Sequence, residues 1–334
     1  MKISFSFIIP VFNRPDEVEE LLSSLLKQTY SKNFEIVIVE DGSTISCEDV
    51  VANFKEHLTI SYFKKPNSGP GDSRNFGMER ALGTYFIILD SDCILPPQYL
   101  LTVDKLLSSK FVHCFGGPDA AHESFSSVQK AINYTMTSFL TTGGIRGNKN
   151  ALSRFQPRSY NMGISKELFT SVGGFGNIHP GEDPDLTIRI WNKGYETSLF
   201  TKAFVYHKRR IGWQKFYVQV TKFGMVRPIL NLWHPQTRKI TYWFPSLFII
   251  GFVMAWFVLI VYSQFLGLYC YGFYFSVLFV DALVKTRSIK IATLALWATL
   301  VQFMGYGYGF IKSTIILNLS TKEPNKVFPK LFFK

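Results

Sequence analysis

Short apolar runs alternate with amphipathic segments over the first 115 residues of the chain. The apolar runs predict buried strands at residues 5–11, 35–39, 59–64, 85–89 and 111–115. Leucine spacing and turn residues predict helices that begin at Asp16, at Asp72 and at Pro96. Strands that alternate with helices form parallel units with right-handed crossovers, so we expect an α/β domain built on a mostly parallel, Rossmann-like sheet.

The pattern is weaker from about residue 117 to residue 160. Glycines at 143, 144 and 147 and scattered basic residues interrupt it. We therefore expect an irregular, partly mobile segment that lies over a site. Regular patterning returns at Tyr160, and residues 199–206 have the composition of a strand.

Two long uncharged runs mark the second half of the chain. Residues 240–280 contain no charged side chain, and this run is long enough for two membrane-spanning helices of roughly 20 residues with a turn near Ser263. Residues 291–311 form a second uncharged run. We expect about three transmembrane helices within residues 239–316, followed by a basic tail at 317–334.

Basic residues indicate how these helices are oriented in a membrane. Arg238 and Lys239 flank the first apolar run, and three further basic residues lie at 285–290, between the second and third helices. Both places are therefore expected in the cytoplasm, together with the N-terminal domain, whose first residues lack a signal-peptide pattern. The tail is also rich in lysine, although a third crossing would place it outside, so the side of the tail stays open.

A basic, aromatic segment lies between the two parts, at residues 207–238. The whole chain has a formal net charge of +12, which suits nucleic acid, anionic lipid or phosphate-bearing substrates. Basic residues that interleave with Trp213 and Phe216 just before a membrane span favour interfacial helices on lipid headgroups over a site for single-stranded nucleic acid. We expect a membrane partner and no nucleic acid.

Polar and acidic residues follow three of the predicted strands, where parallel sheets bind their ligands. The sharpest group is Asp90-Ser91-Asp92, directly after the strand at 85–89. Two carboxylates at this spacing can hold one divalent cation, Mg²⁺ or Mn²⁺, which would neutralise the charge on a departing nucleotide diphosphate. The alternative is a surface turn that caps the next helix. The four cysteines form no C-x-x-C pair and are expected to be reduced thiols.

A second acidic group, Glu182-Asp183-Pro184-Asp185, stands at the start of a predicted helix that ends at Gly194. A carboxylate in this position can be exposed and still held in place, so Asp183 can take a proton from an acceptor hydroxyl as a general base. The alternative is a helix cap that interacts with the helix dipole, and Asp185 fits that role.

Taken together, the motifs resemble the family 2 glycosyltransferases of GT-A fold. The resemblance spans about residues 3–225 and rests on the order of the groups Ile9-Pro10-Val11-Phe12-Asn13, Glu40-Asp41-Gly42-Ser43, Gly69-Pro70-Gly71-Asp72-Ser73-Arg74-Asn75, Asp90-Ser91-Asp92, Asn161, Gly173-Gly174-Phe175 and Glu182-Asp183. It implies a GT-A domain at residues 1–206 that inverts the anomeric centre of a UDP- or GDP-linked sugar.

The resemblance also implies a role for each matching residue. The base and ribose pocket would be formed by Pro10, Phe12, Arg14 and Asp41. The diphosphate and donor sugar would lie near Arg74, Asn75 and Asp90. The metal would be held by Asp92 and His207, the sugars would be contacted by Asn161 and Glu182, and Asp183 would be the base.

The resemblance further implies an integral membrane enzyme of the bacterial inner membrane that extends a lipid-linked saccharide or glycan in surface-polysaccharide synthesis. Residues 207–213 lack the Gln-x-x-Arg-Trp motif of processive relatives, which favours transfer of one sugar. Asp72 and Ser73 stand where relatives commonly have small apolar residues. Two alternatives stay open: a polyprenyl-phosphate sugar synthase, and a scaffold or transport protein with an inactive transferase domain.

Overall fold

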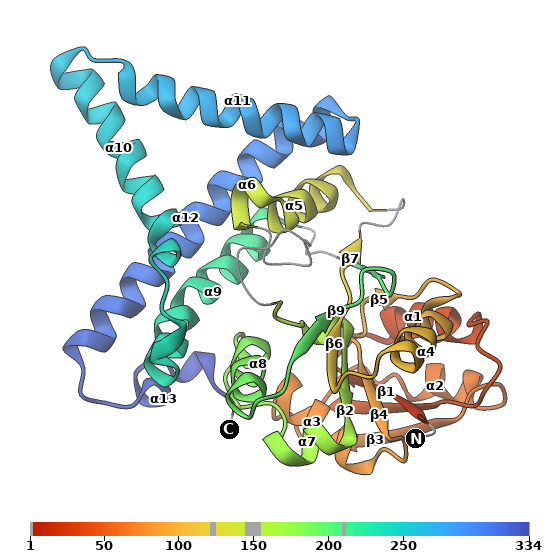
Figure 1. Cartoon of the computed structure of the whole chain (residues 1–334). Coiled ribbons are helices and arrows are strands. Elements are labelled where there is room, and N and C mark those ends of the chain that lie inside the picture. Colours follow the sequence, from red (N-terminus) through yellow and green to blue (C-terminus); the bar gives the residue numbers. More distant parts are fainter. Residues whose placement is uncertain (1–2, 121–124, 144–154, 209–211, 334) are drawn as a thin grey trace. The chain divides into compact units, whose positions relative to one another are not determined.

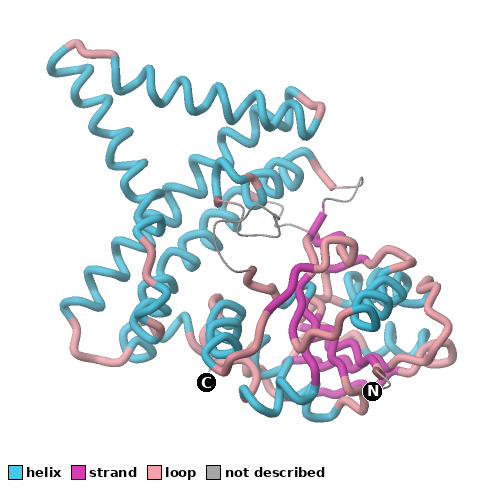
Figure 2. The backbone as a smooth tube through the Cα atoms, viewed as in Figure 1, coloured by secondary structure: helices cyan, strands magenta, loops and turns pink. Residues whose placement is uncertain are grey.

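The computed structural model describes residues 3–120, 125–143, 155–208 and 212–333 (Figure 1). The chain forms two compact units. The first unit contains residues 1–122, 145–208 and 332–334, and the second contains residues 123–144 and 209–331. Among the described residues all strands lie in the first unit, whereas the second is helical (Figure 2).

A seven-stranded sheet forms the centre of the first unit. Its strand order is β3-β2-β1-β4-β8-β6-β9. All neighbours are parallel except β8, which runs antiparallel to both β4 and β6. The strands are β1 (Phe5–Val11), β2 (Glu35–Asp41), β3 (Ile60–Lys65), β4 (Tyr85–Ile88), β6 (Cys114–Gly116), β8 (Met162–Ser165) and β9 (Thr197–Leu199). The expectation of a mostly parallel α/β sheet is confirmed.

Helices cover both faces of this sheet, which explains why its strands are apolar without alternation. Phe7 and Ile9 of β1 point to a core shared with α1 (Pro15–Leu26), α2 (Glu48–Phe54) and α4 (Tyr99–Ser109). Ile8 points to the opposite core, shared with α3 (Pro70–Arg80), α7 (Lys166–Val172) and α8 (Glu182–Asn192). The carboxyl ends of β1, β2 and β4 therefore open at one edge, between the two helical layers.

Helix α3 begins at Pro70, two residues before the predicted start. Proline suits the first turn of a helix because its fixed φ is already helical and its missing N–H has no partner there. Gly77 lets α3 approach the sheet closely, because a Cβ at this position would overlap the side chain of Ile8. Two other boundaries also move: α4 begins at Tyr99 rather than at Pro96, and β6 begins at Cys114 rather than at Phe111.

A small second sheet adjoins the edge where ligands are expected. It consists of β5 (Cys93–Ile94), β10 (Val205–His207) and β7 (Asp119–Ala120), in the order β5-β10-β7. The single strand predicted at 199–206 is in fact divided between β9 and β10. The antiparallel register of β10 and β5 sets His207 opposite Cys93, so a residue from late in the chain lies beside the Asp-Ser-Asp group.

The second unit contains three helices that are long and apolar enough to cross a membrane: Ile240–Tyr262, Leu266–Thr286 and Ile289–Leu319. Its helices are α5 (Ser127–Thr137), α6 (Phe139–Thr142), α9 (Trp213–Trp233), α10 (Phe244–Tyr262), α11 (Leu266–Thr286), α12 (Ile289–Leu319) and α13 (Pro324–Val327). Short 3₁₀ turns occupy Ser159–Asn161, Pro235–Thr237, Ile240–Trp243 and Pro329–Leu331. The most apolar 18 residues of each candidate differ in how much of them is buried. The buried share is 6% for Ile240–Tyr262, 11% for Leu266–Thr286 and 44% for Ile289–Leu319.

Helices α9 and α12 pack closely through glycines. A Cβ at Gly309 would overlap the carbonyl of Thr221, and one at Gly305 would overlap Val220. Gly305 and Gly309 lie four residues apart on one face of α12, the spacing that brings helix backbones together in membranes. The glycines therefore explain how α12 can bury one face although it is apolar all round.

The prediction of an irregular segment at 117–160 is wrong for residues 127–142, because these residues form α5 and α6. Helix α5 begins with a capping box, in which Ser126 and Gln129 satisfy each other's backbone N–H groups. Its Ile132 and Met136 pack against Phe216 of α9, within the second unit. Residues 144–154 of that stretch lie outside the described residues.

Candidate active site

The Asp-Ser-Asp group forms a tight turn directly after β4. The backbone N–H of Cys93 donates to the carbonyl of Asp90 at 3.2 Å, and the carbonyl of Asp92 accepts from the N–H of Lys208 at 3.1 Å. The turn is thus held between β4 and the end of β10. Both carboxylates are directed to the carboxyl edge of the main sheet.

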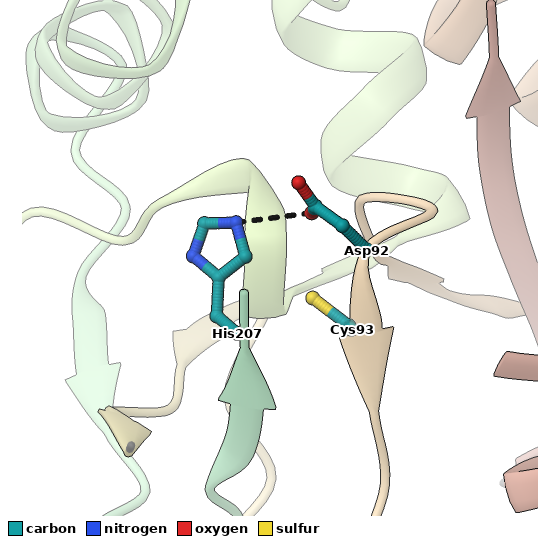
Figure 3. A group of neighbouring side chains, drawn as sticks. All are labelled: Asp92, Cys93 and His207. Atoms are coloured by element: carbon teal, nitrogen blue, oxygen red, sulfur yellow. Dashed lines mark ion pairs between the residues drawn. The ribbon is translucent and has the colours of Figure 1, made fainter. Parts of the chain in front are cut away.

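Asp92 and His207 form the closest pair of potential metal ligands in this turn. Nε2 of His207 lies 3.1 Å from Oδ1 of Asp92 and 3.9 Å from Oδ2 of Asp90. The ligand atoms of Asp92, Cys93 and His207 all lie within 4.8 Å of one another (Figure 3). The ring of Tyr160 stacks on that of His207, with centroids 4.8 Å apart, and so fixes its plane.

These side chains fit a divalent cation. A carboxylate and an imidazole suit Mn²⁺, and Mg²⁺ accepts the carboxylate with water in the remaining positions. The thiol of Cys93 is softer and is buried, and it donates to the carbonyl of Tyr160 at 3.4 Å. The two residues predicted as metal ligands, Asp92 and His207, are therefore together. Cys93, which the sequence interpretation took for an ordinary thiol, is the third member of the group.

Arg74 is the central cation of the site. Its Nη2 donates to Oδ1 of Asp90 at 2.8 Å and its Nη1 to Oε1 of Glu182 at 3.2 Å. The guanidinium also lies over the ring of Phe175, 5.3 Å from the centroid. Arg74 is buried, so it joins the turn after β4 to the first residue of α8 in a water-poor environment.

The start of α8 carries two carboxylates with opposite properties. Burial disfavours the charge of Glu182, but the charges of His179 and Arg74 together lower its pKa below the ordinary value. Burial and the negative charge of Glu182 raise the pKa of Asp183 to about 6. Oδ1 of Asp183 is buried and has no hydrogen-bond partner among the described residues. A carboxylate in this condition is suited to accept a proton near neutral pH.

A continuous series of contacts links the two acidic groups. Asp92 contacts His207, which lies near Asp90, and Asp90 is paired with Arg74. The charges of Arg74 and Asp90 both act on Asp183. The structure therefore places the predicted metal ligands and the predicted base around one group of charges.

The end of β1 contributes the next part of the site. Phe12 is half exposed, and Nη1 of Arg14 lies 3.3 Å from Oδ2 of Asp92. Asn13, in the left-handed region at φ 54°, accepts the backbone N–H groups of Thr44 and Ile45 at 2.7 and 2.9 Å. This side chain ties the loop after β1 to the loop after β2. Pro10 is the half-buried residue before Val11 in β1.

Asp41 organises the loop that precedes α3. Its Oδ1 accepts from Nζ of Lys65 at 2.7 Å and from the N–H of Ser68 at 2.9 Å, and its Oδ2 accepts from the N–H of Gly69 at 2.9 Å. Both oxygens are thus bonded within the protein. A direct bond from Asp41 to a base or ribose would have to share or replace one of these bonds.

Asn75 and Asn161 also have protein partners. The amide of Asn75 is bonded to both the carbonyl and the N–H of Phe175, at 2.9 and 2.8 Å. The amide of Asn161 is fully buried, accepts from the hydroxyl of Tyr99 at 2.6 Å and donates to the carbonyl of Ala203 at 2.8 Å. Each side chain holds two segments of the site's framework, and a contact with a sugar would require exchange of these bonds.

Other residues at the site were missed by sequence reasoning. Nδ1 of His179 donates to Oε1 of Glu182 at 3.0 Å, and Lys65 neutralises Asp41. Asp185 pairs with Arg189 at 2.9 Å, which in turn bonds the carbonyls of Val172 and Gly174. Asp185 therefore has a structural role as the ion-pair partner of Arg189, not as the helix cap that was expected. His179 stands three residues before Glu182, a spacing that carries little information before the loop is folded.

Comparison with known proteins identifies a family for the first part of the chain. Residues 6–169 match the sequence profile of glycosyl transferase family 2. This region of the chain has the sequence features of family 2. The family 2 region contains the strands β1 to β4, the Asp-Ser-Asp turn and Arg74, and Asp183 and His207 lie beyond the matched residues.

Relatives of the chain match it over part of its length. An uncharacterised glycosyltransferase of Rickettsia conorii is 47% identical over 87 residues, which are 26% of this chain and 14% of that protein. An uncharacterised glycosyltransferase of Haemophilus influenzae is 29% identical over 191 residues, 55% of this chain and 61% of that protein. The chain thus spans only a small part of the length of the first of these relatives.

A solved structure shares its fold with nearly the whole chain. A mannosyltransferase from Pyrobaculum calidifontis, solved with GDP-Man and Mn²⁺, superposes with a TM-score of 0.58 at 16% identity, over 95% of this chain and 88% of that chain. The expected GT-A fold, with apolar helices towards the carboxyl end, is confirmed.

Proposed function

We propose that the protein is an inverting glycosyltransferase that moves a sugar from a UDP- or GDP-linked donor to a lipid-linked saccharide or glycan acceptor. The supporting observation is the junction of Asp90, Arg74 and Glu182 next to the pair Asp92 and His207. One side of this junction suits a diphosphate and its metal, and the other presents a carboxylate with raised basicity.

Each of these residues has a defined part in the proposed reaction. Asp183 removes the proton of the acceptor hydroxyl as its oxygen attacks the anomeric carbon, and the bond from that carbon to the diphosphate breaks. Arg14, next to Asp92, and Arg74, next to Asp90, supply positive charge near the leaving group. Asp92 and His207 would hold Mg²⁺ or Mn²⁺, which supplies a Lewis acid for the diphosphate.

The apolar helices of the second unit support an acceptor that is located at the membrane. Its candidate spanning helices would anchor the enzyme in a bacterial inner membrane with the family 2 domain on the cytoplasmic side. The basic and aromatic helix α9 would contact anionic headgroups. Such an anchor would bring the family 2 domain to acceptors that are carried on lipid.

A panel of nucleotide sugars tests this function. The full chain in detergent is incubated with UDP- and GDP-linked sugars, with Mn²⁺, with Mg²⁺ or with a chelator, and nucleotide release is measured with and without bacterial lipid extract. We expect metal-dependent release from one donor class that lipid extract accelerates. Product formed on bare polyprenyl phosphate would indicate the sugar synthase instead, and no release from any donor would refute a transferase.

A further inference from the structure

Two aromatic residues from the far end of the described chain belong to the first unit. Phe332 pairs in an antiparallel bridge with Ile178, and the N–H of Phe333 donates to the carbonyl of Asn177 at 3.0 Å. Both partners lie in the loop that joins α7 to α8. This loop leads directly to the carboxylates of the candidate active site.

The ring of Phe333 lies against two loops of the site. On one side is His179, with ring centroids 5.8 Å apart and planes at 54°. On the other side is Gly69, where a Cβ would overlap the Phe333 ring. Gly69 has φ +94° and donates its N–H to Asp41. The ring therefore touches both the loop that Asp41 organises and the loop that precedes α8.

His179 connects this ring to the charged centre. Its Nδ1 lies 3.0 Å from Oε1 of Glu182, and the same oxygen accepts from Arg74. The side chain of His179 is 40% exposed, in contrast to that of Glu182 at 6%, so its position depends on what packs against it. Phe333 packs against the ring and also ties down the backbone two residues before it, through Asn177.

We propose that Phe333 is a positioning residue for catalysis, which holds His179 against Glu182 and thereby fixes the loop that leads to Asp183 at the start of α8. This proposal rests on the function proposed above. Phe333 does not touch the reacting atoms in this scheme; it acts through His179. Because the ring also covers Gly69, its loss would loosen both the loop that Asp41 organises and the loop that precedes α8.

Kinetics of single variants give the first test. Phe333→Ala in the full chain should lower kcat by about tenfold, the scale seen when a supporting contact of a site is removed. Phe333→Tyr keeps the ring and should restore most of the activity. Lys330→Ala, an exposed change in the same tail, is the matched control and should leave kcat unchanged. Wild-type turnover in Phe333→Ala would overturn the proposal.

A double-mutant cycle separates positioning from general loss of structure. If Phe333 acts through His179, the effect of Phe333→Ala should largely disappear in a His179→Ala background, because the contact is already absent. Equal thermal unfolding temperatures for the single variants would show that both are folded. Fully additive effects on kcat would mean that Phe333 does not act through His179.

Hydrogen exchange makes the proposal testable without any enzymatic assay. Phe333→Ala should speed exchange of the backbone amides at residues 177–183 relative to wild type and to Lys330→Ala, while the amides of β1 stay protected. Unchanged exchange at 177–183 would refute the positioning role. Faster exchange in a protein that turns over no nucleotide sugar would support the contact and refute only the proposed function.

Discussion

The guanidinium of Arg74 pairs with two carboxylates, Asp90 and Glu182. Replacing Arg74 therefore measures how much these ion pairs contribute to the free energy of unfolding. The side chains of Arg74 and Glu182 are only 4% and 6% exposed. Arg74→Met preserves much of the side-chain length but leaves Glu182 buried without its cation. Breaking a buried ion pair in this way costs about 3–5 kcal/mol of unfolding free energy. The partly exposed pair with Asp90 adds less, because solvent screens it.

Thermal unfolding of the full chain in detergent is the assay. A loss of about 3–5 kcal/mol corresponds to a decrease in Tm of about 6–20 °C for a domain of this size. The control is Lys64→Met, which removes an exposed ion pair with Glu48 in the same sheet region. This control should change stability by less than about 1 kcal/mol.

The Tm difference between wild type and Arg74→Met should also depend on pH, which gives a second test. His179 and Arg74 lower the pKa of Glu182, so Glu182 contributes stability that is present above the ordinary carboxyl pKa and is lost as pH falls through the folded value. Without Arg74 that pKa rises, because His179 alone then opposes the effect of burial. The Tm difference between wild type and Arg74→Met should therefore be largest near pH 7 and shrink below about pH 4. A difference no larger than that of Lys64→Met at pH 7, or one that does not change with pH, would refute this reasoning.

Three further predictions concern the base, the metal pair and the helix packing. Asp183→Asn should keep nucleotide affinity, measured by calorimetry, and lower kcat by on the order of 10²-fold or more. Because burial and Glu182 raise the pKa of Asp183, wild-type kcat should fall as pH drops through about 6. A pH profile of kcat that is flat to pH 5 would show that Asp183 is not the base. Asp92→Ala and His207→Ala should each weaken Mn²⁺-dependent binding of nucleoside diphosphate by about tenfold or more, whereas Asp104→Ala, whose carboxylate pairs with Lys32, should not. Gly309→Leu should destabilise the second unit by about 1–3 kcal/mol through overlap with Thr221, and Gly272→Leu, where nothing lies within 4 Å of the added Cβ, should be nearly neutral in the same melting experiment.

Sequence alone predicted the strands that are buried on both faces. The run at 5–11 coincides with β1, because both faces of this strand are covered by helices and its apolar pattern is unbroken. Helix α5 was missed because its apolar residues pack in the second unit and because its residues include two threonines and an asparagine. The capping box at Ser126 and Gln129 is the local signal that could have indicated it.

The placement of site residues was predictable where they follow strand ends. Asp92 lies in the turn that follows β4, and the register of β10 on β5 brings His207 next to it. The partners of buried amides were not predictable, because they depend on which segments meet: Asn161 bonds Tyr99 and Ala203, from distant parts of the chain. The role of His179 was hidden for the same reason.

The return of Phe332 and Phe333 to the first unit has a consequence for topology. Lys208 and Phe333 belong to one folded body, so the chain that leaves at 208 must come back to the same aqueous compartment. Any bilayer between them is then crossed an even number of times, and three crossings would pull Phe333 away from Asn177. The uncharged turn near Ser263 makes α10 and α11 a natural pair of crossings. Helix α12, with Lys290 and Lys312 towards its two ends, would then not complete a third crossing, which agrees with the lysines of the tail.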